Sequence, residues 1–405
     1  MWQYIIMKIL LVTSNLPSAG AGHEDGQHIY HWVKELSGSH TFSLLSFIRE
    51  KERSLLPSAA EYFEEIRTVP AERSMLNRLR RTLLLLSRPF PVAATYSKRL
   101  LHHLREMIAD GSFDCVQFEH FHMGQYARLI KPGIPRILVM PDVASDVLRQ
   151  QVRIASGPRK YYYYREWKLS RYWEKWYAIW SGNVFVMSRK DKGLVESWDV
   201  GCRTYIMPPL LNREIFLGPE EKREPKTILF VGAMHRPGNR DAVFRLKKEI
   251  MPLVRKEYPE ARCLIVGANP PAKIRELSSE SFIVTGPVER IEPYFLSASL
   301  MAVPLRIAGG IIVKIIQAMG AGCPVVASRQ ANAGVGARDN VEILIADRPA
   351  DFAGAIIQLL ASPDEARRIG QAGRQWVARQ YDRNECRRRM ERAYRSVIEE
   401  GKQER

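Results

Sequence analysis

One segment, Leu300–Ser328, constrains the fold of this chain more than any other. An apolar run ends at Pro304, a loop with Gly309 and Gly310 leads into a short helical pattern, and a second apolar run follows at once. A strand, a glycine loop, a helix and a strand in so short a space predict a parallel β-α-β unit. Because the first N–H groups of a helix have no partner within it, such a loop can bind an anion such as phosphate.

Apolar, strand-like runs alternate with amphipathic runs through most of the sequence, which predicts an α/β fold with parallel sheets. The strands expected in the first half are Lys8–Thr13, Thr41–Phe47, Asp114–Phe118, Arg136–Met140, Asn183–Met187 and Thr204–Met207. Those expected in the second half are Thr227–Val231, Cys263–Val266, Phe282–Val284, Leu300–Val303 and Val325–Ala327.

A charged segment with proline and glycine, residues 216–225, separates the two halves. The chain has 405 residues, which is enough for two domains. We therefore expect one domain at 1–217 and another at 218–382, followed by a C-terminal helix and tail at 383–405.

The net charge of +17 favours an anionic partner, which could be a phosphorylated substrate, a membrane surface or a nucleic acid. A nucleic-acid partner rests on this charge alone and is not expected. The five cysteines are scattered without Cys-x-x-Cys spacing, so we expect a reduced, cytoplasmic protein with neither disulfides nor a zinc site. No apolar run approaches the roughly 20 residues that span a bilayer.

The loop after the first expected strand is rich in glycine, with Gly20, Gly22 and Gly26. Its spacing is G-x-G-x-x-x-G, one residue longer than the dinucleotide-binding pattern, so we do not expect NAD here. At the carboxyl edge of a parallel sheet the loop could contact a substrate, and Gly20, Gly22 and His23 are candidates for its acceptor side. The alternative is an ordinary solvated loop.

Polar residues also follow the later strands of the first half. Glu119 and His120 come directly after one expected strand, and Asp142 follows the next. A carboxylate or imidazole at this edge could bind a sugar hydroxyl or transfer a proton. The alternative for the histidines is a packed or capping role, and a metal site at His120 and His122 lacks a third ligand at recognisable spacing.

Two segments combine basic and apolar or aromatic residues. Residues 73–88 place leucines on one stripe flanked by arginines, and residues 160–180 carry six tyrosines and four tryptophans among Lys and Arg. Such belts are typical of peripheral membrane attachment, here at the cytoplasmic face. The aromatic residues could instead stack on nucleotides, or the stripes could pack inside the protein.

The second half has two candidate phosphate loops. Gly232 and Arg236 follow an expected strand, so the backbone can approach a ligand and a guanidinium can reach a phosphate. Residues 306–312 offer backbone N–H groups at a helix start, and Lys314 and Gln317 lie on one face of that helix. A cation and an amide suit a nucleoside diphosphate and its ribose, whereas the alternative is a tight strand–helix turn without a ligand.

Four motifs of the second half resemble the donor-binding half of GT-B glycosyltransferases, specifically the large retaining family four (glycosyl transferases group 1). They are FVGAMHRPGN (230–239), CLIVGANPP (263–271), VTGPVERIEPYF (284–295) and VPLRIAGGIIVKIIQAMGAGCPVVAS (303–328). A weaker likeness covers MKILLVTSNLPSAG, FDCVQFEHFHMGQY and VFVMSRKDKGLV in the first half. The resemblance implies two Rossmann-like α/β domains facing across a cleft, with a C-terminal helix that crosses back to the N-terminal domain.

The resemblance also implies an activity: transfer of a sugar from a nucleotide diphosphate sugar to a glycan, lipid or small-molecule acceptor, with retained anomeric configuration and without a metal or other cofactor. The acceptor, anionic or lipid-linked, would bind the N-terminal domain, on the side of Asp142. The catalytic residues would be Glu119, His120 and Lys314. The donor site would contain Gly232, Arg236, Asn239, Val288, Arg306, Gly309, Gly310, Ile311, Ile312 and Gln317.

The sequence departs from the family at one pair of positions. Where the family commonly has two glutamates eight residues apart, this chain has Gly309 and Gln317. An amide oxygen accepts hydrogen bonds from ribose hydroxyls but lacks the charge that makes such bonds about twice as strong. Two alternatives therefore stay open: a nucleotide-sugar-binding protein without turnover, and a GT-B-shaped sugar-nucleotide epimerase.

Overall fold

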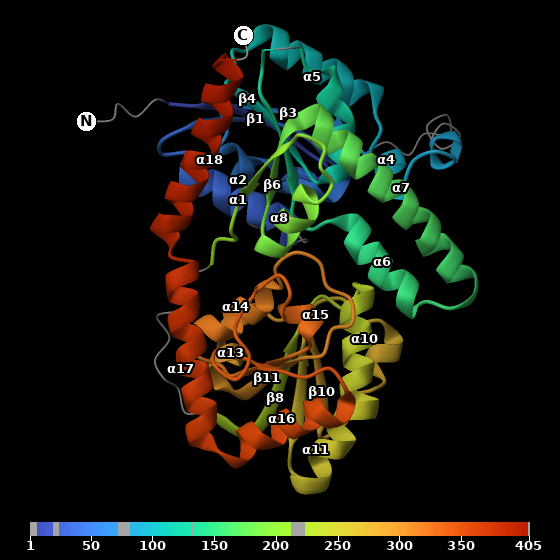
Figure 1. Ribbon diagram of the computed structural model, residues 1–405, viewed down its shortest axis with the longest axis vertical. Helices are drawn as coiled ribbons and strands as arrows, with labels where there is room; N and C mark the ends of the chain where they lie inside the picture. Colours follow the sequence, from blue (N-terminus) through green and yellow to red (C-terminus); the bar gives the residue numbers. More distant parts are fainter. Residues whose placement is uncertain (1–5, 19–23, 72–81, 132, 212–222, 404–405) are drawn as a thin grey trace. The chain divides into compact units, whose positions relative to one another are not determined.

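The structure is a computed structural model that describes residues 6–18, 24–71, 82–131, 133–211 and 223–403. Contacts between Cα atoms divide the chain into two units, the first made of residues 1–210 and 384–405 and the second of residues 211–383 (Figure 1). The domain boundary that the sequence predicts, between residues 217 and 218, lies outside the described residues.

The first unit contains a seven-stranded sheet in the order β3-β2-β1-β4-β5-β6-β7. All of its strand pairs are parallel. The strands are β1 (Lys8–Thr13), β2 (Thr41–Ile48), β3 (Glu65–Pro70), β4 (Cys115–Glu119), β5 (Arg136–Met140), β6 (Gly182–Val186) and β7 (Arg203–Ile206). The strand order changes direction between β1 and β4, and ligands of such sheets bind beyond the carboxyl ends of the strands at this point.

Helices cover the sheet of the first unit. The α-helices are α1 (Glu24–Leu36), α2 (Leu56–Ala60), α4 (Phe90–Ala94), α5 (Lys98–Asp110), α6 (Ala144–Ile154), α7 (Gly157–Ser181), α8 (Arg189–Glu196) and α18 (Arg383–Gln403). Two 3₁₀ segments, η1 (Glu50–Leu55) and η2 (Phe121–Leu129), complete the unit. Helix α7 is 25 residues long and packs Tyr177 and Ala178 into the core.

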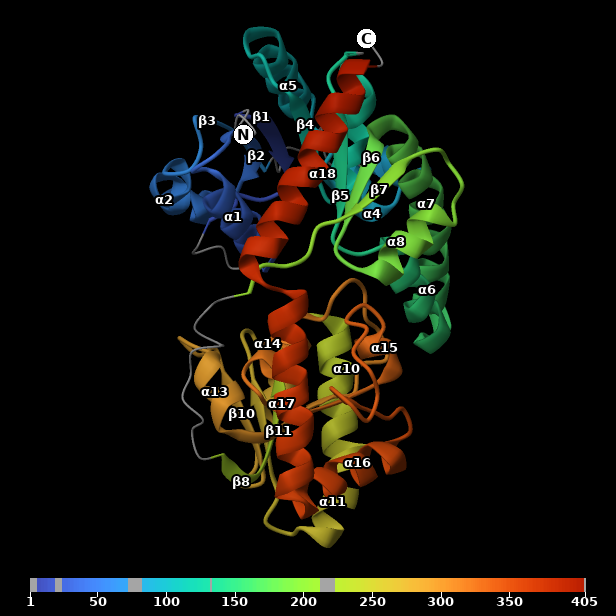
Figure 2. The same ribbon diagram turned by 60° about the vertical axis from the view of Figure 1, so that its left-hand side comes forward.

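Helix α18 returns to the first unit from the far end of the sequence and runs across its strands (Figure 2). Its apolar face, with Cys386, Met390, Tyr394 and Val397, is buried. The Tyr394 hydroxyl donates a hydrogen bond of 2.7 Å to Oε1 of Gln117 in β4. The C-terminal helix therefore completes the core of the first unit, as the family resemblance implies.

The second unit contains a six-stranded parallel sheet in the order β10-β9-β8-β11-β12-β13. Its strands are β8 (Glu224–Val231), β9 (Arg262–Val266), β10 (Phe282–Gly286), β11 (Ala298–Val303), β12 (Val325–Ala327) and β13 (Leu344–Ile345). Its helices are α10 (Pro237–Arg245), the π-helical η3 (Leu246–Ile250), α11 (Met251–Glu257), α12 (Ala272–Arg275), α13 (Glu292–Ser297), α14 (Val313–Gly320), α15 (Arg329–Asn332), α16 (Pro349–Ala361) and α17 (Pro363–Gln380). Its strand order changes direction between β8 and β11.

These two parallel sheets confirm the predicted α/β fold, and each expected strand is present within two or three residues of its predicted ends. Two strands were not predicted. Strand β3 is mostly half-buried at the sheet edge, and β13 has only two residues. Neither forms the continuous apolar run by which a buried parallel strand is recognised.

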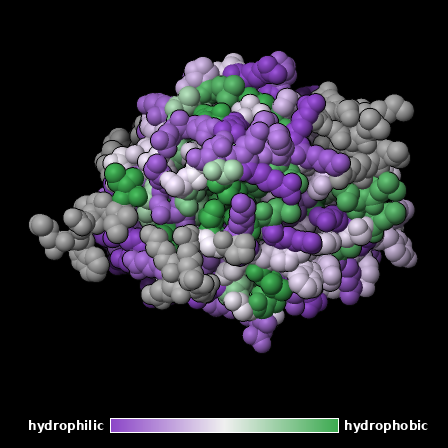
Figure 3. Space-filling model, turned by 90° about the horizontal axis from the view of Figure 1, so that it is seen from above, coloured by the Kyte–Doolittle hydropathy of each residue, from purple (hydrophilic) through white to green (hydrophobic). Residues whose placement is uncertain are grey.

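One face of the molecule, the state of the cysteines and the helix lengths bear on how this protein meets its surroundings. Figure 3 shows hydrophobic residues in separate small groups between hydrophilic ones. All five cysteines are free thiols, and four of them are buried. Among the residues that the structure describes, none of the helices combines the length and apolar character needed to cross a bilayer.

Candidate functional site

The loops that follow β8 and β11 form the candidate site of the second unit, because these neighbouring strands flank the point where the strand order changes direction. The loop after β8 begins at Gly232, whose N–H donates to the Val266 carbonyl over 2.9 Å. In the same way Met234 donates to the Ala268 carbonyl over 2.9 Å. The loop after β8 is thus held against the loop after β9.

Gly232 lies tightly against two polar side chains, which would have to shift to make room for a methyl group. A Cβ atom there would lie 2.6 Å from Nζ of Lys314 and 2.7 Å from Nδ2 of Asn239. Its neighbour Gly267 is equally restricted, since a Cβ would lie 2.0 Å from the Gly232 carbonyl oxygen. Gly232 thus lies directly against the Lys314 ammonium group, and the approach of a ligand to its backbone stays a prediction.

Lys314 and Asn239 bring the two loops together. Nζ of Lys314, in the first turn of α14, donates to Oδ1 of Asn239 over 2.8 Å. The same ammonium lies 4.5 Å from the centre of the Phe230 ring, and Nδ2 of Asn239 donates to the Ala233 carbonyl over 2.9 Å. A half-buried cation is thus fixed at the carboxyl edge of the sheet, where an anionic group would be stabilised.

The loop after β11 turns through Gly310, whose φ of 58° lies in the left-handed region that favours glycine. Gly334 packs directly on this turn, because a Cβ at residue 334 would lie 1.7 Å from the Gly310 carbonyl oxygen. Helix α14 then begins after Ile312 without a side-chain cap. The N–H groups at the start of α14 are therefore not used by a capping side chain, as anion binding at a helix N-terminus requires.

The remaining predicted donor residues lie on the segments that follow β8, β10 and β11. Gly309, Ile311 and Val288 are half-buried, and Gln317 lies one turn beyond Lys314 on α14. Arg236 is exposed at the N-cap of α10. All of them belong to the carboxyl edge of the second sheet.

Arg306 is engaged in an ion pair that the sequence did not predict. Its guanidinium makes two hydrogen bonds to the Asp241 carboxylate, one of them 2.8 Å long from Nε to Oδ2. These bonds raise the pKa of Arg306 above its ordinary value. The two residues are far apart in sequence, so the pair joins the loop after β11 to α10 and positions the loop.

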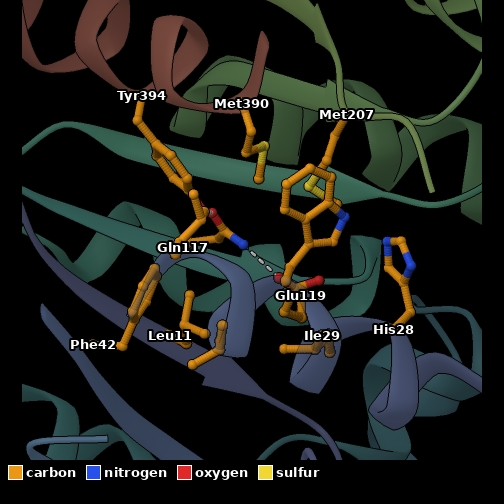
Figure 4. A pocket seen from close by; sticks show the side chains of 12 residues that line it. Leu11, His28, Ile29, Phe42, Gln117, Glu119, Met207, Met390 and Tyr394 are labelled. Atoms are coloured by element: carbon orange, nitrogen blue, oxygen red, sulfur yellow. Dashed lines mark hydrogen bonds between the residues drawn. The ribbon is translucent and has the colours of Figure 1, made fainter. Parts of the chain in front are cut away.

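In the first unit, Glu119 is the last residue of β4 and is almost completely buried. Its Oε1 accepts a hydrogen bond of 2.5 Å from Nε2 of Gln117, which in turn accepts one from Tyr394. Figure 4 shows Glu119 and Gln117 in a small pocket together with His28, Met207 and Met390. The Glu119 carboxylate thus belongs to a buried polar chain that anchors α18.

His120 follows in an unusual conformation. Its φ of 69° is positive, which few residues other than glycine adopt. Its ring stacks on that of His122 with 5.4 Å between the centres. Burial, with a smaller contribution from His120, lowers the pKa of His122 to about 3. His122 is therefore neutral, and the strained, half-buried His120 is the imidazole at this strand end that is suited to a functional role.

Asp142 is exposed after β5, beside a group of buried carboxylates that the sequence did not reveal. Burial raises the pKa of Glu174 to about 8 and that of Asp191 to about 6, and the charge of Asp142 adds to both effects. Asp146 is also buried, but its pKa is lowered by two cations, Lys190 (Nζ to Oδ2, 2.6 Å) and Arg149. These buried carboxylates come from three different helices, so no short sequence motif predicts that they lie close together.

Three predicted acceptor-side positions, Gly20, Gly22 and His23, lie outside the described residues, and so do residues 73–81 of the basic segment. Within the part of the chain that is described, no three His, Cys, Asp or Glu side chains come together as metal ligands would. Among the described donor-site candidates, the structure brings Gly232, Asn239 and Lys314 into contact.

Comparison with known proteins adds two findings. Residues 225–362 match the family model of glycosyl transferases group 1. No curated protein sequence matches the chain significantly.

Solved structures resemble the chain over nearly its whole length. Sucrose-phosphate synthase from Thermosynechococcus elongatus is 16% identical with a TM-score of 0.70, over 97% of this chain and 99% of its own. Anabaena HepE in complex with UDP and glucose is 11% identical with a TM-score of 0.65, over 96% and 100%. A S. aureus TarM variant in complex with fondaparinux, alpha-GlcNAc-glycerol and UDP is 10% identical with a TM-score of 0.68, over 96% and 100%. At these identities the likeness establishes the fold, which is the GT-B fold of two parallel α/β domains.

Proposed function

We propose that this protein is a glycosyltransferase that moves a sugar from a nucleotide diphosphate sugar to an acceptor hydroxyl, with retained anomeric configuration and without a metal or other cofactor. The observation that carries the proposal is the contact of Lys314 with Asn239 beside Gly232, at the carboxyl edge of the second sheet. This contact lies within the part of the chain that matches the family model, residues 225–362.

The donor diphosphate would bind where the loops after β8 and β11 meet. The N–H groups of Gly310, Ile311 and Ile312 would donate to its oxygens, and Lys314 would stabilise the charge that develops as the diphosphate leaves. Arg236 would add a second cation, while Arg306 would hold its loop through Asp241. Val288 would lie against the base, and Gly309 and Gln317 would face the sugar and the ribose.

Among the first-unit candidates we assign His120, not Glu119, to the reacting sugar. The Glu119 carboxylate is buried and accepts a hydrogen bond from Gln117, so it is occupied in holding the core. Because the sequence has no paired carboxylates at a spacing that suggests double displacement, we favour a same-face mechanism in which the leaving phosphate itself receives the acceptor proton. Asp142 would contribute to the acceptor side.

The donor and acceptor classes follow from the chemistry of the site and from the relatives. The HepE and TarM structures contain UDP, so a UDP-sugar is the first donor to test. The net charge of +17 favours an anionic acceptor, either a glycan or a lipid-linked compound.

The test is release of nucleoside diphosphate from UDP-, GDP-, ADP- and dTDP-sugars, with and without lipid and glycan acceptors. We expect one donor to be consumed faster when an acceptor is present. Lys314→Ala should lower that rate about 100-fold or more, since removing one such electrostatic contact typically costs this much. Lys273→Ala, an exposed position of the same unit, serves as the matched control and should be unchanged. An acceptor-dependent rate that survives Lys314→Ala would remove this lysine from the mechanism.

A second candidate function is nucleotide-sugar binding without turnover, which Gly309 and Gln317 favour because they replace two expected carboxylates. It predicts that the donor binds but no diphosphate is released with any acceptor. An epimerase would instead convert the sugar of the donor with no acceptor present, which analysis of the recovered donor would reveal.

A further inference from the structure

The outer face of α7 is unusual for a protein surface. Five aromatic or aliphatic side chains along it are strongly exposed: Tyr161 (79%), Tyr162 (50%), Tyr164 (47%), Tyr172 (54%) and Ile179 (43%), and Trp176 (39%) lies between the last two. Lys168 and Arg171 are exposed among them. Because α7 has 25 residues, this face extends over about 37 Å.

Acidic and basic residues lie on different faces of α7. Its two carboxylates point inward: Glu166 is 3% exposed and Glu174 is fully buried. Glu166 accepts a hydrogen bond from the Phe90 N–H over 2.7 Å, and Glu174 accepts one from the Ser145 N–H over 3.2 Å. The outer face therefore carries cations without an acidic residue, unlike a solvated helix face, where both signs are usually mixed.

Residues 82–90 pack beside α7, against Trp173 and Glu166, and add exposed apolar groups next to it. Nε1 of Trp173 in α7 donates to the Ser87 carbonyl over 2.8 Å, and the Arg88 guanidinium lies 4.6 Å from the centre of the Trp173 ring. Leu83, Leu86 and Phe90 project outward, with exposed fractions of 62%, 80% and 54%. The described part of the first basic segment, residues 82–88, thus lies beside α7, which contains the second.

We propose that this outer surface of α7 and residues 82–90 docks on an anionic lipid bilayer. Tyrosine and tryptophan side chains reside at the boundary between headgroups and acyl chains, where their rings are apolar and their polar atoms stay hydrated. Leu83, Leu86 and Phe90 enter the acyl region, and the lysines and arginines bind lipid phosphates and carboxylates.

Lipid fits this surface better than a nucleic acid does. A single-stranded nucleic acid would use the cations and the aromatic rings, but the exposed leucines offer nothing to bases or phosphates. The exposure of Leu83, Leu86 and Phe90 is explained if these side chains enter an apolar phase. Charge complementarity then selects anionic headgroups over zwitterionic ones.

The proposal is tested by sedimentation of the full-length protein with two kinds of vesicle: phosphatidylcholine alone, and phosphatidylcholine mixed with an equal part of phosphatidylglycerol. We expect the wild-type protein to sediment with the anionic vesicles and much less with the zwitterionic ones. The double variant Lys168→Glu, Arg171→Glu should weaken anionic binding by at least about tenfold, from the interaction of each basic residue with a charged surface. Tyr161→Ala with Tyr172→Ala should weaken it by on the order of tenfold at unchanged charge.

The matched control is Lys256→Glu with Lys273→Glu, which makes the same change of net charge at exposed positions of the second unit and should bind like the wild type. Circular dichroism and thermal unfolding check that each variant is folded. Equal vesicle binding by the wild type, both α7 variants and the control would overturn the proposal. So would a loss of single-stranded RNA binding in the α7 variants without a loss of vesicle binding, since the surface would then serve nucleic acid.

Discussion

The two parallel sheets share the order of six strands, to which the first sheet adds β7, but the ends of their central strands are built differently. Beyond β8 and β11 the arrangement depends mainly on the backbone. Gly232 lets the loop after β8 lie against Lys314, which supplies the charge, and Gly310 allows a left-handed turn in the loop after β11. Beyond β1 and β4 side chains dominate, with a buried Glu119 and a stacked His120. Main-chain N–H groups, which nearly all residues have, can bind an anion, whereas the polar groups beyond β1 and β4 come from particular side chains.

The largest effect should come from the second unit, through Gly232→Ala. The new methyl group would meet Nζ of Lys314 and the amide of Asn239, both ends of side chains that can move aside. The protein should therefore stay folded while turnover falls about 100-fold, because Lys314 no longer occupies its place. Steady-state kinetics and thermal unfolding measure the two quantities separately.

Gly354→Ala is the control for this substitution, since nothing lies within 4 Å of a Cβ at residue 354 in α16. It should retain activity and gain up to about 1 kcal/mol of stability, as alanine does over glycine in a helix. Full activity of Gly232→Ala would show that the close approach of the backbone is not needed for the reaction.

In the first unit the corresponding substitution is Tyr394→Phe, which should lower the stability of the fold and not the turnover. It removes the hydroxyl that donates to Gln117 and leaves a buried amide oxygen without that partner. The free energy of unfolding should fall by about 2 kcal/mol, as measured by denaturant titration. A fall in turnover without a fall in stability would mean that the chain from Tyr394 to Glu119 belongs to the reaction and not to the core.

The buried carboxylate Glu174 should make the stability of the protein depend on pH. Burial raises its pKa from 4.5 in the unfolded chain to about 8, so the folded protein holds a proton that the unfolded chain releases. The free energy of unfolding should therefore decrease between these pH values as pH rises, by up to about 1.4 kcal/mol per pH unit. In Glu174→Gln this decrease should become smaller, and an unchanged slope in thermal unfolding would contradict the assignment.

The smallest effect is expected for Gln317→Glu. A carboxylate at this position would accept ribose hydroxyls with a charge, which is worth about 1 kcal/mol over an amide. The dissociation constant of the donor nucleotide should fall about fivefold in calorimetric titration. Weaker binding of the nucleotide by Gln317→Glu than by the wild type would indicate that Gln317 lies away from the ribose.

The sequence predicted the fold well because buried parallel strands are nearly continuous apolar runs, such as KILLVT in β1. Strand β3 was not predicted because it lies at the sheet edge and carries the charged residues Glu65 and Arg67, which interrupt its apolar pattern. The tight contact at Gly232 and the left-handed turn at Gly310 were predictable because glycine at these positions reflects a requirement of the backbone. The roles of Glu119 and Arg306 could not be predicted. Glu119 is linked through Gln117 to Tyr394, and Arg306 pairs with Asp241, and both of these residues come from elements distant in sequence.

The return of α18 to the first unit has a consequence for how this protein is made. Cys386, Met390, Tyr394 and Val397 fill a core whose other members lie before residue 211. During synthesis the second unit, residues 211–383, is complete before the first one is. The first unit, whose strands are synthesised before the second unit, therefore completes its native core only after helix α18 has been made, and until then the apolar face that α18 covers stays exposed.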